Sequence, residues 1–271
     1  MSPLSQWPEA DRRQILGVFT DIDDTLTTDG VVPPSTVQAL ADLKAAGLHV
    51  IPITGRPVGW SEPFARDWPV DAIVAENGAV ALTASPIGLQ PAPALRGALS
   101  KLYQQSDAVR AANFARMQQV AQRVLRDVPG ARLARDSAGR ETDIAIDHSE
   151  FAHLTPAQVE AVVRTMQAEG MTATVSSIHI NGWYGDHNKL DGARWIVRTL
   201  LGRALDAELQ RWVYVGDSTN DQLMFEHFPH SVGVANIRRF EAQLTHKPRY
   251  ITLGERGEGF AEVARAVLAA R

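Results

Sequence analysis

A run of apolar residues that leads directly into a cluster of carboxylates is the feature that most limits how this chain can fold. Residues 15–19 are largely apolar, and Asp21, Asp23 and Asp24 follow at once. Carboxylates packed together raise each other's pKa, so such a cluster is costly unless a cation or a reaction uses it. In a strand, Asp21 and Asp23 share a face, and ligands of open α/β sheets bind at the carboxyl ends of the strands. Taken alone, the segment is equally compatible with a turn or a helix cap, which Asp also favours.

The two ends of the chain alternate strand and helix patterns. Apolar strands are predicted at residues 15–21, 48–54, 71–76 and 212–216, with shorter ones at 232–235 and 250–253. A helix between the first two has Ser35 as its expected N-cap and Gly47 as its stop, and a last amphipathic helix is expected at residues 260–270. Strands separated by helices favour parallel pairing through right-handed crossovers. The prediction is therefore an α/β fold built on a parallel sheet.

The middle of the chain follows a different pattern. Pro86, Pro91 and Pro93 mark a boundary, beyond which residues 94–128 are rich in helical pattern, with room for a break near Ser106. Two strands are expected at 131–136 and 141–147, a helix from Thr155 to Gly170, and two more strands at 172–176 and 178–184. The predicted order of one helix followed by two strands occurs twice, which indicates an α+β module inserted into the α/β domain. We expect a core of residues 1–90 and 187–271 and an inserted module of residues 91–186.

Composition excludes several classes of function. The chain has 271 residues, no cysteine, a net charge of −4 and a pI of about 6.1. Disulfides, thiolate catalysis and cysteine-ligated zinc are therefore excluded, and neither a nucleic acid nor an anionic membrane is an expected partner. The first residues lack an apolar signal core and no apolar run is long enough to cross a bilayer, so a cytoplasmic protein is expected.

Four motifs stand at predicted strand ends or helix starts: DIDDT at Asp21, TGR at Thr54, NK at Asn188 and Lys189, and GDSTND at residues 216–221. In order and spacing they resemble the haloacid dehalogenase (HAD) superfamily of phosphoryl-transfer enzymes. The inserted α+β module then stands where the type IIB, or Cof-like, members have their C2 cap. Residues 39–57 and 73–79 also look like the sugar-phosphate phosphatase branch of those subfamilies.

The resemblance implies a Rossmann-like core, a mobile cap and a Mg²⁺-dependent phosphatase. The expected substrate is a small phosphorylated metabolite, either a sugar phosphate or an ester of the phosphoglycerate or phosphoglycolate type. Sucrose-phosphate, mannosyl-phosphoglycerate and phosphoglycolate phosphatases have similar caps, and the motifs do not choose among them. Asp21 would be the nucleophile that forms an aspartyl-phosphate, and Asp23 the general acid and base.

The same resemblance implies the binding residues. The ligands of Mg²⁺ would be the Asp21 carboxylate, the Asp23 backbone carbonyl and Asp217, with Asp221 beside the ion. The residues expected to hold the phosphoryl group or the substrate are Thr54, Gly55, Arg56, Lys189, Asn220, His179 and Asn181. Arg56 is equally compatible with a surface ion pair, and Trp183 and Tyr184 with packing in the module's core. The His179–His187 and His227–His230 pairs lack ligand spacing with a third partner, which favours structural roles.

Four alternatives remain in view. A phosphomutase uses the same aspartyl chemistry but returns the phosphoryl group to a sugar. A dehalogenase would have no use for the leaving-group acid Asp23. A phosphorylatable receiver-type switch also has clustered Asp, a Thr or Ser and a Lys, but is shorter and has no inserted cap. A degenerate binding module is disfavoured because every expected catalytic residue is present.

Overall fold

A parallel six-stranded sheet forms the centre of the computed structural model, which describes residues 1–84 and 99–271. In spatial order its strands are β1 (Ser2–Pro3), β13 (Tyr250–Ile251), β12 (His230–Gly233), β11 (Trp212–Gly216), β2 (Gly17–Thr20) and β3 (His49–Pro52). The chain passes from β2 to β3 on one side and from β11 to β12 on the other. The topological switch point therefore lies between β2 and β11, where ligands of such sheets bind.

Alternate side chains of these strands are buried on opposite faces. Val18 and Val213 pair in register and pack towards one set of helices, whereas Phe19 and Tyr214 pack towards the other. The first set contains α2 (Pro34–Ala45), α3 (Val58–Asp67) and α8 (Arg256–Leu268), with the short α1 (Glu9–Arg13) against α8. The second contains α6 (Lys189–Leu201) and α7 (Gln222–His227). The described core thus has the predicted α/β architecture.

A second, antiparallel sheet extends the core beside β3. It consists of β4 (Ile73–Ala75), β5 (Val80–Thr83) and β6 (Ser100–Tyr103), and a single parallel bridge joins Ile53 to Val74. The helix predicted from residue 94 is therefore wrong over residues 100–103, because Leu102 and Tyr103 pack against the core as part of a strand. Residues 85–98, which include the predicted boundary between residues 90 and 91, lie outside the described part of the chain.

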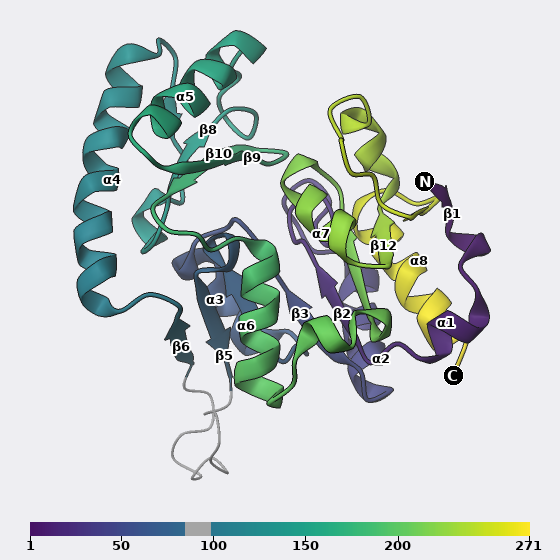
Figure 1. The fold of residues 1–271 in the computed structure, drawn as a ribbon. Coiled ribbons are helices and arrows are strands. Elements are labelled where there is room, and N and C mark those ends of the chain that lie inside the picture. The colour runs from purple at the N-terminus through teal and green to yellow at the C-terminus, as the bar shows by residue number, and fades with distance from the viewer. Residues whose placement is uncertain (85–98) are drawn as a thin grey trace.

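A smaller unit, residues 107–183, is inserted between β6 and α6 (Figure 1). Its antiparallel sheet has the order β7 (Arg132–Leu133), β8 (Ile144–Asp147), β10 (His179–Trp183) and β9 (Thr172–Val175). Helices α4 (Asp107–Asp127) and α5 (Pro156–Ala168) cover one face, where Ile146 and Ile180 are buried. Strand alternation places His179 and Asn181 on the opposite face of this sheet.

Helix ends follow the predicted chemistry in part. Gly47 follows α2 with a φ of 78°, the left-handed conformation that glycine adopts without strain. Ser35 is not the N-cap that was predicted: Pro33 has that place, Pro34 begins the helix, and the Ser35 hydroxyl donates to Glu258 instead. In the described residues we find no helix with the length and apolar character needed to span a membrane.

Candidate active site

Three of the four sequence motifs meet where parallel strands end. Asp21 follows β2, Thr54 lies just beyond β3, and Asp217 follows β11, so the parallel pairing brings all three to one edge of the sheet. Lys189 is the first residue of α6, which Asn188 caps through a side-chain bond to the Asp191 amide of 2.9 Å. Long-range sheet pairing, and not local chain geometry, therefore assembles this site.

Lys189 lies between two buried carboxylates. Its Nζ donates to Asp21 Oδ1 and to Asp221 Oδ1, each at 2.7 Å, and its side chain is 3% exposed. Burial raises the pKa of Asp21 to about 7, although Lys189 opposes this shift. Burial and the nearby Asp21 and Asp221 also hold the pKa of Asp217 well above its usual range. One lysine therefore does not balance the negative charge of this cluster.

Asp221 is occupied by protein donors on both oxygens. Besides Lys189, the Tyr214 hydroxyl donates to Oδ1, and the backbone amides of Asp217 and Ser218 donate to Oδ2 at 3.0 and 3.1 Å. A carboxylate so engaged holds Lys189 and the 216–221 loop in place and has little capacity left for a direct metal bond. Sequence reasoning missed Tyr214, which comes from within a buried strand.

Asp217, by contrast, has one free oxygen. Asn236 donates to its Oδ2 at 3.0 Å, whereas Oδ1 is buried without a hydrogen-bond partner among the described residues. Asp21, Asp217 and Asp221 also offer oxygens that all lie within 4.8 Å of one another. A buried unpaired carboxylate oxygen in a surplus of negative charge fits a hard divalent cation, which prefers oxygen ligands.

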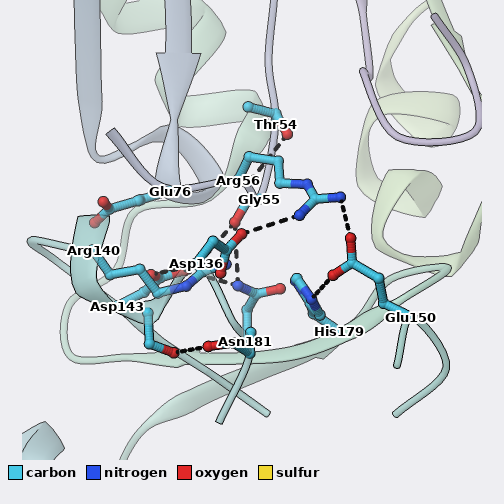
Figure 2. Close-up of polar contacts among 12 residues, drawn as sticks. Thr54, Gly55, Arg56, Glu76, Asp136, Arg140, Asp143, Glu150, His179 and Asn181 are labelled. Atoms are coloured by element: carbon cyan, nitrogen blue, oxygen red, sulfur yellow. Dashed lines mark hydrogen bonds and ion pairs between the residues drawn. The ribbon is translucent and has the colours of Figure 1, made fainter. Parts of the chain in front are cut away.

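Asp23 bonds Arg56, which belongs to a second network. Figure 2 shows how this network joins Arg56 of the core to Glu150 and His179 of the smaller unit. Arg56 Nε lies 2.9 and 3.0 Å from the two Asp23 oxygens, and the same guanidinium reaches Asp136 at 3.1 Å and Glu150 at 2.9 Å. Glu150 in turn bonds His179 at 2.8 Å. Burial raises the pKa of Asp23, while Arg56 opposes that effect. Arg56 is 6% exposed, so the surface ion pair considered from the sequence is wrong.

Glu150 is held ionised by this arrangement. Burial would raise its pKa, but the hydrogen bonds from His179 and Arg56 outweigh that effect and lower the pKa to about 2. Neither Glu150 nor Asp136 stands in a motif, so sequence reasoning could not select them. Asp136 lies in the loop after β7 and Glu150 in the loop after β8, and only the packing of the two units brings these loops to Arg56.

The backbone of the TGR segment is also bound from the smaller unit. The Gly55 carbonyl accepts from Arg140 Nη1 at 3.0 Å and from Asn181 Nδ2 at 3.3 Å, and both donors also bond Asp143 (Figure 2). Thr54 Oγ1 accepts from the Arg56 amide at 3.0 Å. Asn181 and His179, which the sequence analysis expects to bind the substrate, thus lie close to the TGR segment: Asn181 bonds the Gly55 carbonyl, and His179 bonds Glu150, which pairs with Arg56.

Glu76 makes a third connection between the two units. Its buried carboxylate accepts from the amides of Val58, Glu141 and Thr142 at 3.1, 3.0 and 2.5 Å. Burial raises its pKa, and these hydrogen bonds oppose the rise. Glu76 therefore joins the start of α3 to the loop before β8.

The remaining sequence candidates lie apart from these networks. Asn220 accepts from the Ser218 hydroxyl at 2.9 Å within its own loop. Trp183 and Tyr184 belong to the core of the smaller unit, and their polar atoms donate to the carbonyls of His187 and Glu169. Of the two roles considered for these aromatic residues, the structure shows packing in the core of the smaller unit.

His187 gives the stability of the protein a specific pH dependence. Its ring stacks on Trp183 with centroids 5.4 Å apart, and burial lowers its pKa to about 4 from 6.5. The unfolded chain therefore takes up this proton first, and stability is lost as the pH falls from 6.5 towards 4. Between about pH 7.5 and pH 5, the free energy of unfolding should therefore fall by about 2 kcal/mol more in the wild type than in His187→Phe, as measured by urea unfolding. An identical pH dependence in both proteins would contradict this.

The comparisons with known proteins agree with the geometry. A model of the haloacid dehalogenase-like hydrolases matches residues 18–87. A search of curated protein sequences gave no match. A protein from Plasmodium vivax described as a HAD/COF-like hydrolase has 16% identity and a TM-score of 0.68, over 97% of this chain and 100% of its own.

Two sugar-phosphate enzymes share the fold. The C-terminal domain of trehalose-6-phosphate phosphatase from C. albicans has 13% identity and a TM-score of 0.66, and each chain is covered over 100%. The sucrose-phosphatase of Synechocystis, solved with sucrose and phosphate, has 14% identity and a TM-score of 0.63, over 94% of this chain and 98% of its own. The chain thus matches the haloacid dehalogenase-like hydrolases in sequence over residues 18–87, and over its whole length it shares the fold of a protein described as a HAD/COF-like hydrolase and of two sugar-phosphate phosphatases.

Proposed function

We propose that this protein is a Mg²⁺-dependent phosphatase that cleaves a small phosphomonoester through an aspartyl-phosphate on Asp21. The observation that carries the proposal is the buried pairing of Asp21 with Lys189 at 2.7 Å, beside Asp217 with its unpaired oxygen. Asp23 lies two residues from Asp21, with the other ion-pair network as its partner. A nucleophile, a cation partner and a separate acid are the groups that this reaction needs.

In the first step, an Asp21 oxygen attacks phosphorus and the bond from phosphorus to the alcohol oxygen breaks. Asp23 gives its proton to that oxygen, and the alcohol leaves. In the second step, Asp23 takes a proton from water as the water oxygen attacks the same phosphorus, which releases inorganic phosphate and restores the Asp21 carboxylate. The burial that raises the pKa of Asp23 favours the proton it needs for the first step.

The cation would be held by the carboxylates of Asp21 and Asp217 and by the backbone carbonyl of Asp23, with Asp221 beside it. When bound, Mg²⁺ would reduce repulsion between Asp21 and the phosphate dianion. Thr54 and Lys189 would hold the phosphoryl oxygens, and Lys189 would offset the charge that develops on them. Asn220 and the Gly55 segment are further candidates for phosphate or water contacts.

We further propose that residues 107–183 act as a cap that moves relative to the core. Two short connections, residues 104–106 and 184–188, join this unit to the core. The bonds from Arg140 and Asn181 to the Gly55 carbonyl would hold the unit against the active site. Closure of this kind excludes water and selects the leaving group.

The charge around Asp23 favours a neutral leaving group rich in hydroxyls, such as a sugar. Arg56 is already matched by the carboxylates of Asp23, Asp136 and Glu150, and His179 is bonded to Glu150. A leaving group that carries a carboxylate, as in phosphoglycerate or phosphoglycolate, would meet like charge here, whereas hydroxyls can donate to these oxygens. The sugar-phosphate enzymes of similar fold support the same choice.

The test is release of inorganic phosphate from a panel of sugar phosphates, phosphoglycerate, phosphoglycolate and an aryl phosphate. We expect release that EDTA abolishes and added Mg²⁺ restores, with sugar phosphates preferred over the carboxylated esters. Failure to release phosphate from any ester would contradict the proposal. Conversion of a sugar phosphate to its isomer without free phosphate would identify a phosphomutase instead.

A further inference from the structure

The side chain of Asn236 connects three separate segments behind the carboxylate cluster. Its Nδ2 donates to the Asp24 carbonyl and to Asp217 Oδ2, both at 3.0 Å, and its Oδ1 accepts from the Arg256 amide at 2.8 Å. The side chain is buried, with the residue 3% exposed. Because two of these partners are acceptors and the third is a donor, the orientation of the amide is fixed by its surroundings.

The bond to Asp217 determines which oxygen of that carboxylate is free. Oδ2 is engaged by Asn236, and Oδ1 is the buried oxygen without a partner among the described residues. Without Asn236, the Asp217 carboxylate could rotate, and both of its oxygens would lack that donor. Asn236 therefore leaves one particular oxygen of Asp217 free for the proposed cation.

The bond to Asp24 fixes the other loop of the cluster. Asp24 has a φ of 55°, a left-handed conformation that costs a residue other than glycine some free energy. Its carbonyl is bound by Asn236, and its carboxylate pairs with Arg256 at 3.2 Å. The backbone that carries Asp21 and Asp23 is thus tied to the same amide that orients Asp217.

We propose that Asn236 is a positioning residue that sets the loops after β2 and β11 in the geometry needed to bind a divalent cation. This inference rests on the cation site of the proposed function. Asn236 stands in none of the motifs and is not a ligand itself, since all three of its polar bonds go to protein groups. Its loss should weaken cation binding by about 10- to 100-fold, as is typical of groups that orient metal ligands.

Two variants of Asn236 distinguish positioning from charge. Asn236→Ala removes the donor and leaves buried partners unpaired. Asn236→Asp keeps the size of the side chain but sets a carboxylate oxygen against two acceptors. If charge alone governed binding, the added negative charge of Asn236→Asp would tighten the binding of Mg²⁺. If positioning governs it, both variants bind Mg²⁺ more weakly than the wild type.

The experiment is calorimetric titration of the full-length proteins with Mg²⁺, with circular dichroism to establish that each is folded. Asn113→Ala is the matched control, because Asn113 also donates from Nδ2 to two acceptors, Gln105 and the Tyr184 carbonyl, but in the smaller unit. We expect wild-type affinity in the control and weaker binding in both Asn236 variants. Unchanged affinity in folded Asn236→Ala, or tighter binding in Asn236→Asp, would overturn the proposal.

The same titration separates this inference from the proposed function. If the wild type binds Mg²⁺ but releases no phosphate, the phosphatase proposal fails and the role of Asn236 stands on the binding data. If the wild type binds no Mg²⁺, the cation site is absent and the role of Asn236 is overturned with it.

Discussion

Asp21→Asn is expected to lower phosphate release by about 10³-fold or more, because an amide is a poor nucleophile and cannot form the aspartyl-phosphate. The loss should appear in kcat with every substrate of the panel. Stability should not fall in parallel. Burial raises the pKa of Asp21 to about 7, so the ionised carboxylate is costly in the fold, and an amide of the same size removes that cost. Lys189 keeps its bond to Asp221.

The measurements are turnover on the best substrate and urea unfolding at neutral pH. Asp67→Asn, at the exposed end of α3, is the matched control and should keep both wild-type activity and stability. Substantial activity in Asp21→Asn would show that water attacks phosphorus directly or that another residue is the nucleophile. The covalent mechanism would then be wrong even if the protein is a phosphatase.

Lys189→Met is expected to lower both activity and stability. The substitution leaves the buried carboxylates of Asp21 and Asp221 without their cation, which should cost about 3–5 kcal/mol of unfolding free energy. It also removes the charge that offsets the phosphoryl oxygens, which should cost about 10²- to 10³-fold in kcat. Lys247→Met is the control: Lys247 pairs with Glu241 at 3.1 Å and is 43% exposed, so the loss there should stay below about 1 kcal/mol.

The stability loss in Lys189→Met should depend on pH in a defined direction. Burial already raises the pKa of Asp21 above its ordinary value, and removal of Lys189 raises it further. A carboxyl group whose pKa is raised by folding stabilises the fold when protonated, so stability is lost as the pH rises through the pKa of the folded state. Urea unfolding should therefore show a smaller deficit at about pH 5.5 than at about pH 8. An equal deficit at both values would mean that lost packing, and not charge, explains the effect.

The sequence predicted the parallel core and the convergence of the motifs, because both depend on short patterns. An apolar strand that ends in Asp21 or Asp217 implies the edge of the sheet where those side chains lie. Lys189, which bonds Asp21, was selected as a site residue only through the order of the motifs, since an isolated lysine is ordinarily a surface residue. The strand at Ser100–Tyr103 was missed because it forms by pairing with β5 and packing against the core, and the local residue pattern does not predict these contacts.

The contacts that surround the motif residues could not be predicted in the same way. Asn236, Tyr214 and Glu150 acquire their partners through contacts between distant segments, and each is ordinary in its local context. Asn236 lies three residues after the buried strand β12, within a short helical turn, whereas Asp21 and Asp217 follow their strands directly, so the rule that selected the aspartates does not reach it. Nor does that rule reach Glu150, which lies in a loop of the smaller unit.

The position of β2 has a consequence for synthesis on the ribosome. Gly17–Thr20 is translated before residues 107–183, whereas its neighbour β11 is translated only after the whole of them. The four strands of the smaller unit are contiguous in that window, so we expect this unit to fold while one edge of β2 is still unpaired. An apolar strand with an open edge pairs readily with other chains. The translation of β11 therefore determines when this edge of β2 is protected from aggregation.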